Sequence, residues 1–259
     1  MKVARFAHGE SISFGIVDEE EHDLVVLKAD PMFAGYDPTG ERVPLAEAKL
    51  LAPVIPRSKV VAVGKNYHDH AEEMGGEAPP EPLLFLKPNT AVIGPGDAIV
   101  LPPESDQVEF EGELAVVIGR VARRVSEADA DSVIFGYTIA NDVTARDLQR
   151  RDGQWTRAKG FDTFCPLGPV IETDVDLEHG ELSTSVNGTR HQHGRLADMV
   201  HPVAKIVAYA SNVFTLLPGD VILTGTPAGV GPIVDGDSVD VTVSGLGSLV
   251  NPVRAAATR

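Results

Sequence analysis

The distribution of glycine and proline sets the first limit on how this chain folds. Its 259 residues include 25 glycines and 19 prolines, which are spread along the whole chain and not collected into one linker. Both residues interrupt regular structure and favour turns. The pattern is typical of many short strands joined by turns. We therefore expect a mixed, β-rich α+β fold.

The length of the chain predicts one main domain with a small appendage. A chain of 259 residues is long for one ordinary domain but short for two large ones. Strand-like segments lie within residues 2–27, and a proline-punctuated passage follows at 51–56. We place a boundary there, with a small N-terminal β domain at 1–55 and the main domain at 56–259.

The main domain is expected to contain several apolar strands and few helices. Asn66 is expected to cap a short helix that runs through His70 to Met74. A second helix, from about Asp198 to Thr215, has an apolar stripe at the spacing of a helix packed against a sheet. Strands are predicted at 59–63, 83–86, 109–118, 135–140, 221–224 and 239–243.

The charge balance argues against partners with polyanionic surfaces. The 38 acidic and 22 basic side chains leave a formal net charge of −16, which disfavours nucleic acids and anionic membranes. The single cysteine, Cys165, allows no internal disulfide. The first residues lack the apolar core of a signal peptide, and no uninterrupted apolar window is long enough to span a bilayer. We expect a soluble cytoplasmic protein with no nucleic-acid or membrane partner.

Three glutamates alternate along the segment 108–118. Because successive side chains of a strand point to opposite faces, Glu109, Glu111 and Glu113 are expected on one side. Two interpretations of this face stay open. The carboxylates form a solvated face of an antiparallel strand, or they hold a hard divalent cation, Mg²⁺ or Mn²⁺, through oxygen ligands.

A further acidic residue, Asp142, stands where a predicted strand ends and a helix begins. It is suited either to cap that helix or to complete a metal site. On the following helix, Arg146 and Gln149 either lie on the surface or direct a guanidinium and an amide toward an anionic ligand.

His70 and Glu73 share one face of the predicted short helix because they are three residues apart. A carboxylate beside an imidazole orients the ring and raises its basicity, so the pair is a competent base for activating water, although a surface pair has the same spacing. Lys159 and Thr226 are unremarkable in isolation. The segment 191–193 has the composition of a polar loop.

Several of these segments, in this order, resemble the fumarylacetoacetate hydrolase family. Together they span roughly residues 59 to 253, nearly the whole main domain, and several ordered motifs are more specific than any one of them. The matching pieces are Val63-Gly64-Lys65-Asn66-Tyr67 with His70 and Glu73, Phe85-Leu86-Lys87-Pro88, Glu109 to Gly119, Asn141 to Gln149, Ala158 to Thr163, Leu217 to Asp220, and Gly225 to Gly231.

The resemblance implies a distorted β-roll or β-sandwich around the active site, in a protein that is usually a homodimer. It also implies a role for each matched residue. Glu109 falls one alternation outside the family's metal ligands, so we expect it behind them. The implied metal ligands are Glu111, Glu113 and Asp142, the implied catalytic residues are His70, Glu73 and Lys159, and the positions that line the anionic end of the substrate are Arg146, Gln149 and Thr226.

The implied activity is that of a Mg²⁺-dependent (or Mn²⁺-dependent) enzyme acting on a small anionic 2-oxo acid. We expect cleavage of a C–C bond, by acylpyruvate hydrolysis or oxaloacetate-type decarboxylation. The alternative is an isomerase or decarboxylase of hydroxydienoates such as 2-hydroxyhepta-2,4-diene-1,7-dioate, in aromatic catabolism. These reactions share a metal-bound enolate, so the motifs do not choose between them. A third hypothesis is a non-catalytic metal- or carboxylate-binding module, against which His70, Glu73 and Lys159 argue.

Overall fold

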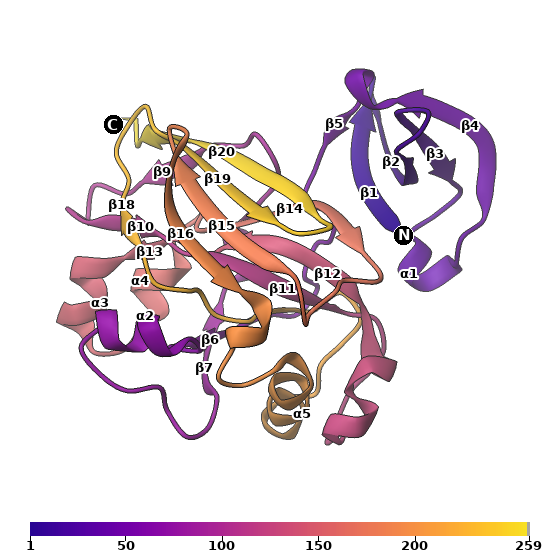
Figure 1. The fold of residues 1–259 in the computed structure, drawn as a ribbon. Coiled ribbons are helices and arrows are strands. Elements are labelled where there is room, and N and C mark those ends of the chain that lie inside the picture. The colour runs from indigo at the N-terminus through magenta and orange to yellow at the C-terminus, as the bar shows by residue number, and fades with distance from the viewer. Residues whose placement is uncertain (258–259) are drawn as a thin grey trace.

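The computed structural model describes residues 1–257 and confirms a strand-rich α+β fold with few helices (Figure 1). Within these residues, no helix is both long and apolar enough to cross a membrane. The strands belong to one large sheet and two smaller ones.

The N-terminal strands form an antiparallel meander. The elements of this unit are β1 (Lys2–His8), β2 (Ser11–Asp18), β3 (Asp23–Leu27), α1 (Pro31–Ala34), β4 (Pro38–Pro44), the 3₁₀ helix η1 (Leu45–Glu47) and β5 (Lys49–Leu50). Strands β1 to β4 pair in sequence order, and β5 pairs with β1. Side chains of these strands, among them Phe6, Leu24 and Val43, form a small core together with Val170 of the main domain.

The large sheet continues from this meander into the rest of the chain. Its further strands are β6 (Val60–Gly64), β7 (Leu83–Lys87), β8 (Val92–Ile93), β11 (Gly112–Ile118), β12 (Ile134–Asn141), β14 (Cys165–Glu172) and β17 (Val221–Leu223). Its strand order is β4-β3-β2-β1-β14-β12-β11-β17-β6-β7, with β8 beside β14. Since β1 pairs with β14 at Lys2 and Val3, the N-terminal unit is tied to the main sheet. The division near residue 55 stays a prediction.

A second sheet packs across the centre of the large one (Figure 1). The strands outside the large sheet are β9 (Ile99–Leu101), β10 (Val108–Phe110), β13 (Thr144–Ala145), β15 (Glu181–Val186), β16 (Thr189–Arg195), β18 (Gly231–Pro232), β19 (Ser238–Val243) and β20 (Gly247–Ala255). The order β16-β15-β19-β20-β9 forms one sheet, and β13-β10-β18 form another. Leu114 and Ile139 of the large sheet share a core with Leu182 and Val241 of the second. This apolar layer makes the main domain a sandwich.

The helices are short and lie at the margins of the sheets. They are α2 (His68–Glu73), α3 (Arg146–Asp152), α4 (Thr156–Gly160) and α5 (Val203–Val213), with 3₁₀ helices η2 (Asn89–Ala91), η3 (Glu127–Val133) and η4 (Leu196–Asp198). In Figure 1, α2, α3 and α4 gather on one side of the main domain, beside the ends of β6, β10 and β13. That side carries the candidate site.

Two helix predictions need correction. The expected helix from Asp198 begins instead at Val203, since the chain forms η4 first and Pro202 stands at the N-cap of α5. A proline disfavours helical backbone in the residue before it, so the helix starts after Pro202. Asn66 does not cap α2 either; Tyr67 holds that position. The buried Asn66 amide instead donates to the carbonyls of His201 and Thr224, at 3.0 and 2.7 Å.

Candidate active site

The glutamate-rich segment is interrupted and does not form the single strand that its alternation predicts. It divides into β10 and β11, which belong to different sheets, and Glu111 lies between them. At the break, the backbone N–H groups of Glu111 and Gly112 donate to the side chains of Asn141 and Gln192, at 3.0 and 2.9 Å. Gly112 packs so closely on β15 that a Cβ there would lie 2.1 Å from Thr184 Oγ1. Side-chain amides therefore replace the strand partners that are lost at the break.

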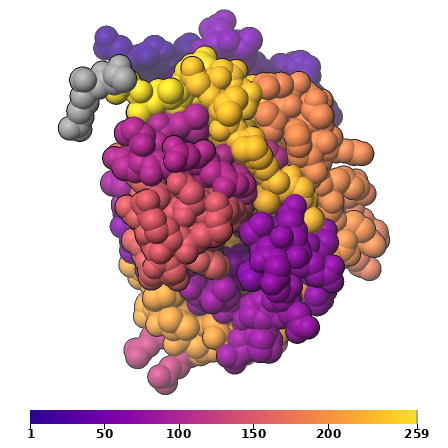
Figure 2. Space-filling model, turned by 90° about the vertical axis from the view of Figure 1, so that its left-hand side faces the viewer, coloured from indigo at the N-terminus to yellow at the C-terminus, as the bar shows by residue number. Residues whose placement is uncertain are grey.

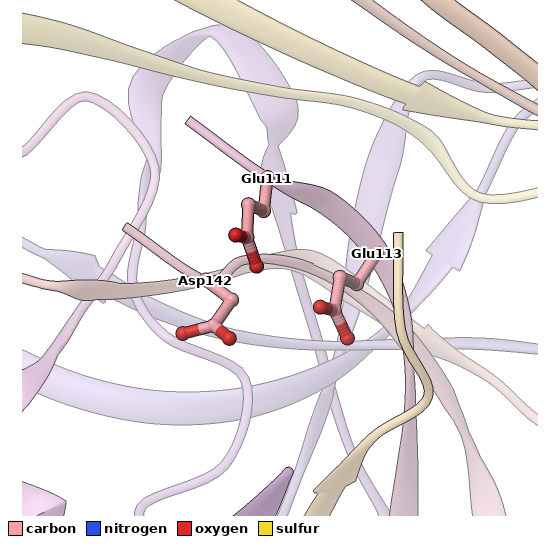
Figure 3. A group of neighbouring side chains, drawn as sticks. All are labelled: Glu111, Glu113 and Asp142. Carbon is pink, nitrogen blue, oxygen red and sulfur yellow. The ribbon is translucent and has the colours of Figure 1, made fainter. Parts of the chain in front are cut away.

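Three carboxylates converge on one point beside this break. Glu111, Glu113 and Asp142 are buried, and one oxygen of each lies within 4.8 Å of the others. Figure 3 shows them pointing toward a common space from β11, from the residue before it and from the end of β12. Asp142 is held there by its backbone N–H, which donates to the Glu111 carbonyl at 2.8 Å. It caps no helix, because α3 begins at Arg146 with Ala145 at the N-cap.

Two buried lysines are bonded to these carboxylates. Lys159 Nζ donates to Glu111 Oε2 at 2.8 Å and to Asp142 Oδ2 at 2.6 Å. Lys87 Nζ donates to the other oxygen of Asp142 at 2.5 Å. Lys87 was assigned no role from the sequence. It stands at the end of an apolar strand, in one of the segments that carry the family resemblance, Phe85-Leu86-Lys87-Pro88.

Arg146 holds a second set of acidic and amide oxygens. Its guanidinium donates to Glu109 Oε2 at 2.8 Å, to Glu111 Oε1 at 2.7 Å and to Gln149 Oε1 at 2.8 Å. Glu109 lies outside the group of three carboxylates, lines the same cavity and anchors this guanidinium. Arg146 therefore orients Glu111 and Gln149.

The two glutamates of the group are held in opposite electrostatic settings. Burial alone would raise the pKa of Glu111, but the charges of Lys159 and Arg146 outweigh it and hold that pKa well below its ordinary value. Burial and the neighbouring charges of Asp142 and Glu111 raise the pKa of Glu113 well above its ordinary value. In the described chain Glu113 has no ion-pair partner and accepts only from the Gly225 N–H, at 2.6 Å. Three buried carboxylates, one of them without a cation, fit the oxygen donor set of a hard divalent ion.

His70 and Glu73 form the pair that their spacing on α2 predicts. His70 Nδ1 and Glu73 Oε2 are 3.1 Å apart, and the other Glu73 oxygen accepts from the Gly229 N–H at 3.1 Å. His70 is only 4% exposed, so the pair is no ordinary surface contact. The carboxylate positions the ring from one side and leaves Nε2 for the cavity.

A cavity of about 590 Å³ brings these groups together. Its mouth is visible in Figure 2 as a hollow between the red-pink segment that contains α3 and α4 and the purple segment that contains α2. Of the nine residues implied by the resemblance, all but Asp142 line it, and Asp142 lies directly behind Lys159. Thr226 lines the cavity, but its hydroxyl already donates to the Gly112 carbonyl at 2.7 Å.

Gln192 was missed from the sequence, and the polar loop predicted at 191–193 is wrong. The segment lies in β16, where Gln192 is fully buried between two exposed histidines. Its amide accepts from Gly112 N–H and donates to Thr226 Oγ1 and to the Pro227 carbonyl, the latter two at 2.7 Å. Gln192 is the one buried residue of a strand made of polar residues and glycine, so no local hydrophobic pattern marked it.

Replacing Gln192 by alanine is expected to lower the free energy of unfolding by about 1–3 kcal/mol, because the Gly112 N–H loses its partner inside the protein. Urea unfolding of the metal-free protein measures the change. The exposed Gln154 accepts only from the Thr156 N–H, at 2.9 Å, and water can replace that bond, so its replacement by alanine should change stability by clearly less, about 0.5 kcal/mol. Equal effects at the two positions would contradict the structural role of the buried amide.

Comparisons with known proteins match both parts of the chain. Residues 59–254 match the model of the fumarylacetoacetate (FAA) hydrolase C-terminal family, and residues 1–53 match the Rv2993c-like N-terminal family. The chain is 52% identical to Protein Rv2993c of Mycobacterium tuberculosis over 260 residues, covering 98% of each chain. It is 43% identical over 223 residues to the oxaloacetate tautomerase YisK of Bacillus subtilis, covering 81% of this chain and 74% of that protein. The solved structure of 2-hydroxyhepta-2,4-diene-1,7-dioate isomerase from Mycobacterium marinum is 50% identical, covers 100% of both chains and has a TM-score of 0.90.

Proposed function

This chain belongs to the fumarylacetoacetate hydrolase family, and from that premise we propose that it is a divalent-metal-dependent enzyme that forms an enolate from a small 2-oxo acid. One observation carries the proposal. Three buried carboxylates converge within 4.8 Å in the same cavity wall as the paired His70 and Glu73. The proposed cofactor is Mg²⁺ or Mn²⁺.

Glu111, Glu113 and Asp142 would hold the ion. When bound, it supplies a Lewis acid that stabilises negative charge on the oxygens of a 2-oxo acid. Lys159 and Arg146 keep two of these carboxylates in place by hydrogen bonds. Lys159 also lies 5.0 Å from the centre of the Phe85 ring, a desolvated position in which its charge helps an anionic substrate to enter a strongly acidic protein.

The His70 and Glu73 pair would move the proton. With Nδ1–H donating to Glu73, His70 Nε2 is free to take a proton from the carbon beside the 2-oxo group. Delivering a proton to the 2-oxo oxygen gives the enol tautomer, and delivering it to a distant carbon gives an isomer. The names of two relatives, an oxaloacetate tautomerase and a hydroxydienedioate isomerase, describe reactions of this kind, which favours proton movement as the first candidate.

Cleavage of a C–C bond is the second candidate. Hydrolysis of an acylpyruvate needs an activated water, and a buried His70 with its carboxylate partner is a competent base for it. Decarboxylation of oxaloacetate needs only stabilisation of the enolate. All of these outcomes share one enolate, so the choice among them depends on the substrate and on where the proton or the water is delivered.

A substrate panel tests the proposed function. Oxaloacetate, acetylpyruvate, fumarylpyruvate and 2-hydroxyhepta-2,4-diene-1,7-dioate would be followed by ultraviolet absorbance, with Mg²⁺ and with EDTA. We expect turnover of at least one compound with Mg²⁺ and its loss with EDTA, since without the ion no Lewis acid stabilises the enolate beside the three carboxylates. Activity undiminished by EDTA would contradict the metal assignment. Metal binding without turnover of any compound would favour the non-catalytic module.

A further inference from the structure

The outer wall of the cavity carries two cations that the catalytic groups do not use. Lys65 follows β6 and Arg150 lies on α3, and both line the cavity. Within residues 1–257, Lys65 has no hydrogen bond or ion pair, and Arg150 donates only to the neutral Gln107 Oε1, at 2.7 Å. In contrast, Arg146, Lys159 and Lys87 are all paired with carboxylates.

Both side chains are placed by the fold. Arg150 is held by Gln107, whose amide donates to the buried Glu109 at 2.6 Å, so its guanidinium is linked to the floor of the site. Lys65 adopts φ +56°, a left-handed conformation that a residue other than glycine keeps only where its surroundings impose it. Its ammonium lies beside Gly76, 3.1 Å from where a Cβ would stand, in the loop after α2. The two cations thus flank the mouth from α3 and from the α2 side.

The charged groups inside the cavity balance one another once a divalent ion is bound, so Lys65 and Arg150 remain unbalanced. The buried carboxylates Glu109, Glu111, Glu113 and Asp142 outnumber the buried cations by one. A divalent ion would reverse that excess to a single positive charge, which the Glu73 carboxylate cancels. Lys65 and Arg150 then contribute two positive charges that no inner group balances, and a dianion is the substrate that matches them.

We propose that Lys65 and Arg150 form a subsite for a second carboxylate, at the end of the substrate remote from the 2-oxo acid group. The subsite makes the enzyme selective for 2-oxo dicarboxylates over 2-oxo acids with a neutral tail. This assignment rests on the proposed function, because the inner carboxylates fix which end of the substrate enters first. Arg150 and Lys65 touch the substrate without taking part in proton transfer, so they act on binding.

The test compares oxaloacetate with its 4-methyl ester, which keeps the length and removes the distal charge. Exchange of the C3 hydrogens with deuterium, followed by NMR, measures enolate formation from both compounds. Lys65→Met and Arg150→Gln are each expected to raise the KM for oxaloacetate about tenfold and to change kcat by less than about twofold. The ester should show no change. Calorimetric binding of oxalate, which has no distal group, should also stay the same.

Arg123→Gln is the matched control, since Arg123 is exposed and lies outside the cavity, yet its loss changes the net charge equally. If Arg123→Gln raised the KM as much, the effect would come from long-range attraction by the net charge, and the proposed subsite would be overturned. Equal losses for oxaloacetate and the ester would overturn it as well, with the proposed function intact. If the wild-type protein exchanges neither compound, the subsite proposal fails, whereas the proposed function fails only if no compound of the whole substrate panel is turned over.

Discussion

Glu113→Gln is expected to lower metal-dependent kcat/KM by about a thousandfold or more while making the metal-free protein more stable than the wild type. The first effect follows because a divalent ion supplies several kcal/mol of charge stabilisation and Glu113 is one of its three proposed ligands. The second follows from the setting of this carboxylate. Burial, Asp142 and Glu111 raise its pKa, and the charge of Lys159, which is bonded to Glu111 and Asp142 instead, does not offset that rise.

The sign of the pH dependence can be worked out from that raised pKa. A carboxyl group with a higher pKa in the folded protein contributes stability below its unfolded pKa, and this contribution is lost as the pH rises through the folded pKa. The metal-free wild type should therefore lose stability relative to Glu113→Gln between about pH 4.5 and neutral pH. Glutamine keeps an acceptor for the Gly225 N–H, so the two proteins differ in the charge at position 113 and not in this hydrogen bond.

Glu111→Gln is the matched comparison, and its effect on metal-free stability should have the opposite sign. Lys159 and Arg146 lower the pKa of Glu111, so its removal takes away one of the two carboxylate partners that each of these buried cations has. Both variants should lose activity and the increase in melting temperature caused by Mg²⁺. Thermal unfolding with EDTA and with Mg²⁺, from pH 4.5 to 7.5, measures the set. If both substitutions destabilised the metal-free protein, the predicted opposite electrostatic settings of Glu111 and Glu113 would be refuted.

His70→Ala is expected to reduce proton transfer and hydrolysis by about 10²- to 10⁴-fold, the usual contribution of a positioned base. Decarboxylation of oxaloacetate should lose far less, since it needs no base. Glu73→Gln should show a smaller loss, because the glutamine still accepts from His70 Nδ1 and orients the ring but carries no charge to stabilise the imidazolium formed when the ring takes a proton. Steady-state rates on the substrate panel measure each reaction separately.

The exposed His68 on the same helix provides the control, and His68→Ala should leave all rates within about twofold. Equal losses in hydrolysis and decarboxylation after His70→Ala would argue that the histidine binds substrate and does not serve as the base. Thermal unfolding of His70→Ala would show whether α2 has lost its structure, in which case the lost activity would reflect folding and His70 would not be assigned as the base.

The sequence predicted most of the strands and the residue types of the site. Apolar runs placed β6, β12, β17 and β19 within one or two residues of their positions. The family match and the sandwich bear out the predicted fold class. Errors arose where a distant segment took part. The break at Glu111 depends on Asn141 and Gln192, and the start of α5 depends on Pro202 and η4.

Periodicity is a local property, so the sequence was sufficient to put Glu109, Glu111 and Glu113 on one side and to pair His70 with Glu73. Even the break between β10 and β11 keeps the three glutamates facing one cavity. Charge balance is not local. It depends on distances between groups that are far apart along the chain, and packing alone sets those distances. Only the folded chain therefore placed Lys87 on Asp142 and raised the pKa of Glu113 while lowering that of Glu111. It also left Lys65 and Arg150 without acidic partners at the mouth of the cavity.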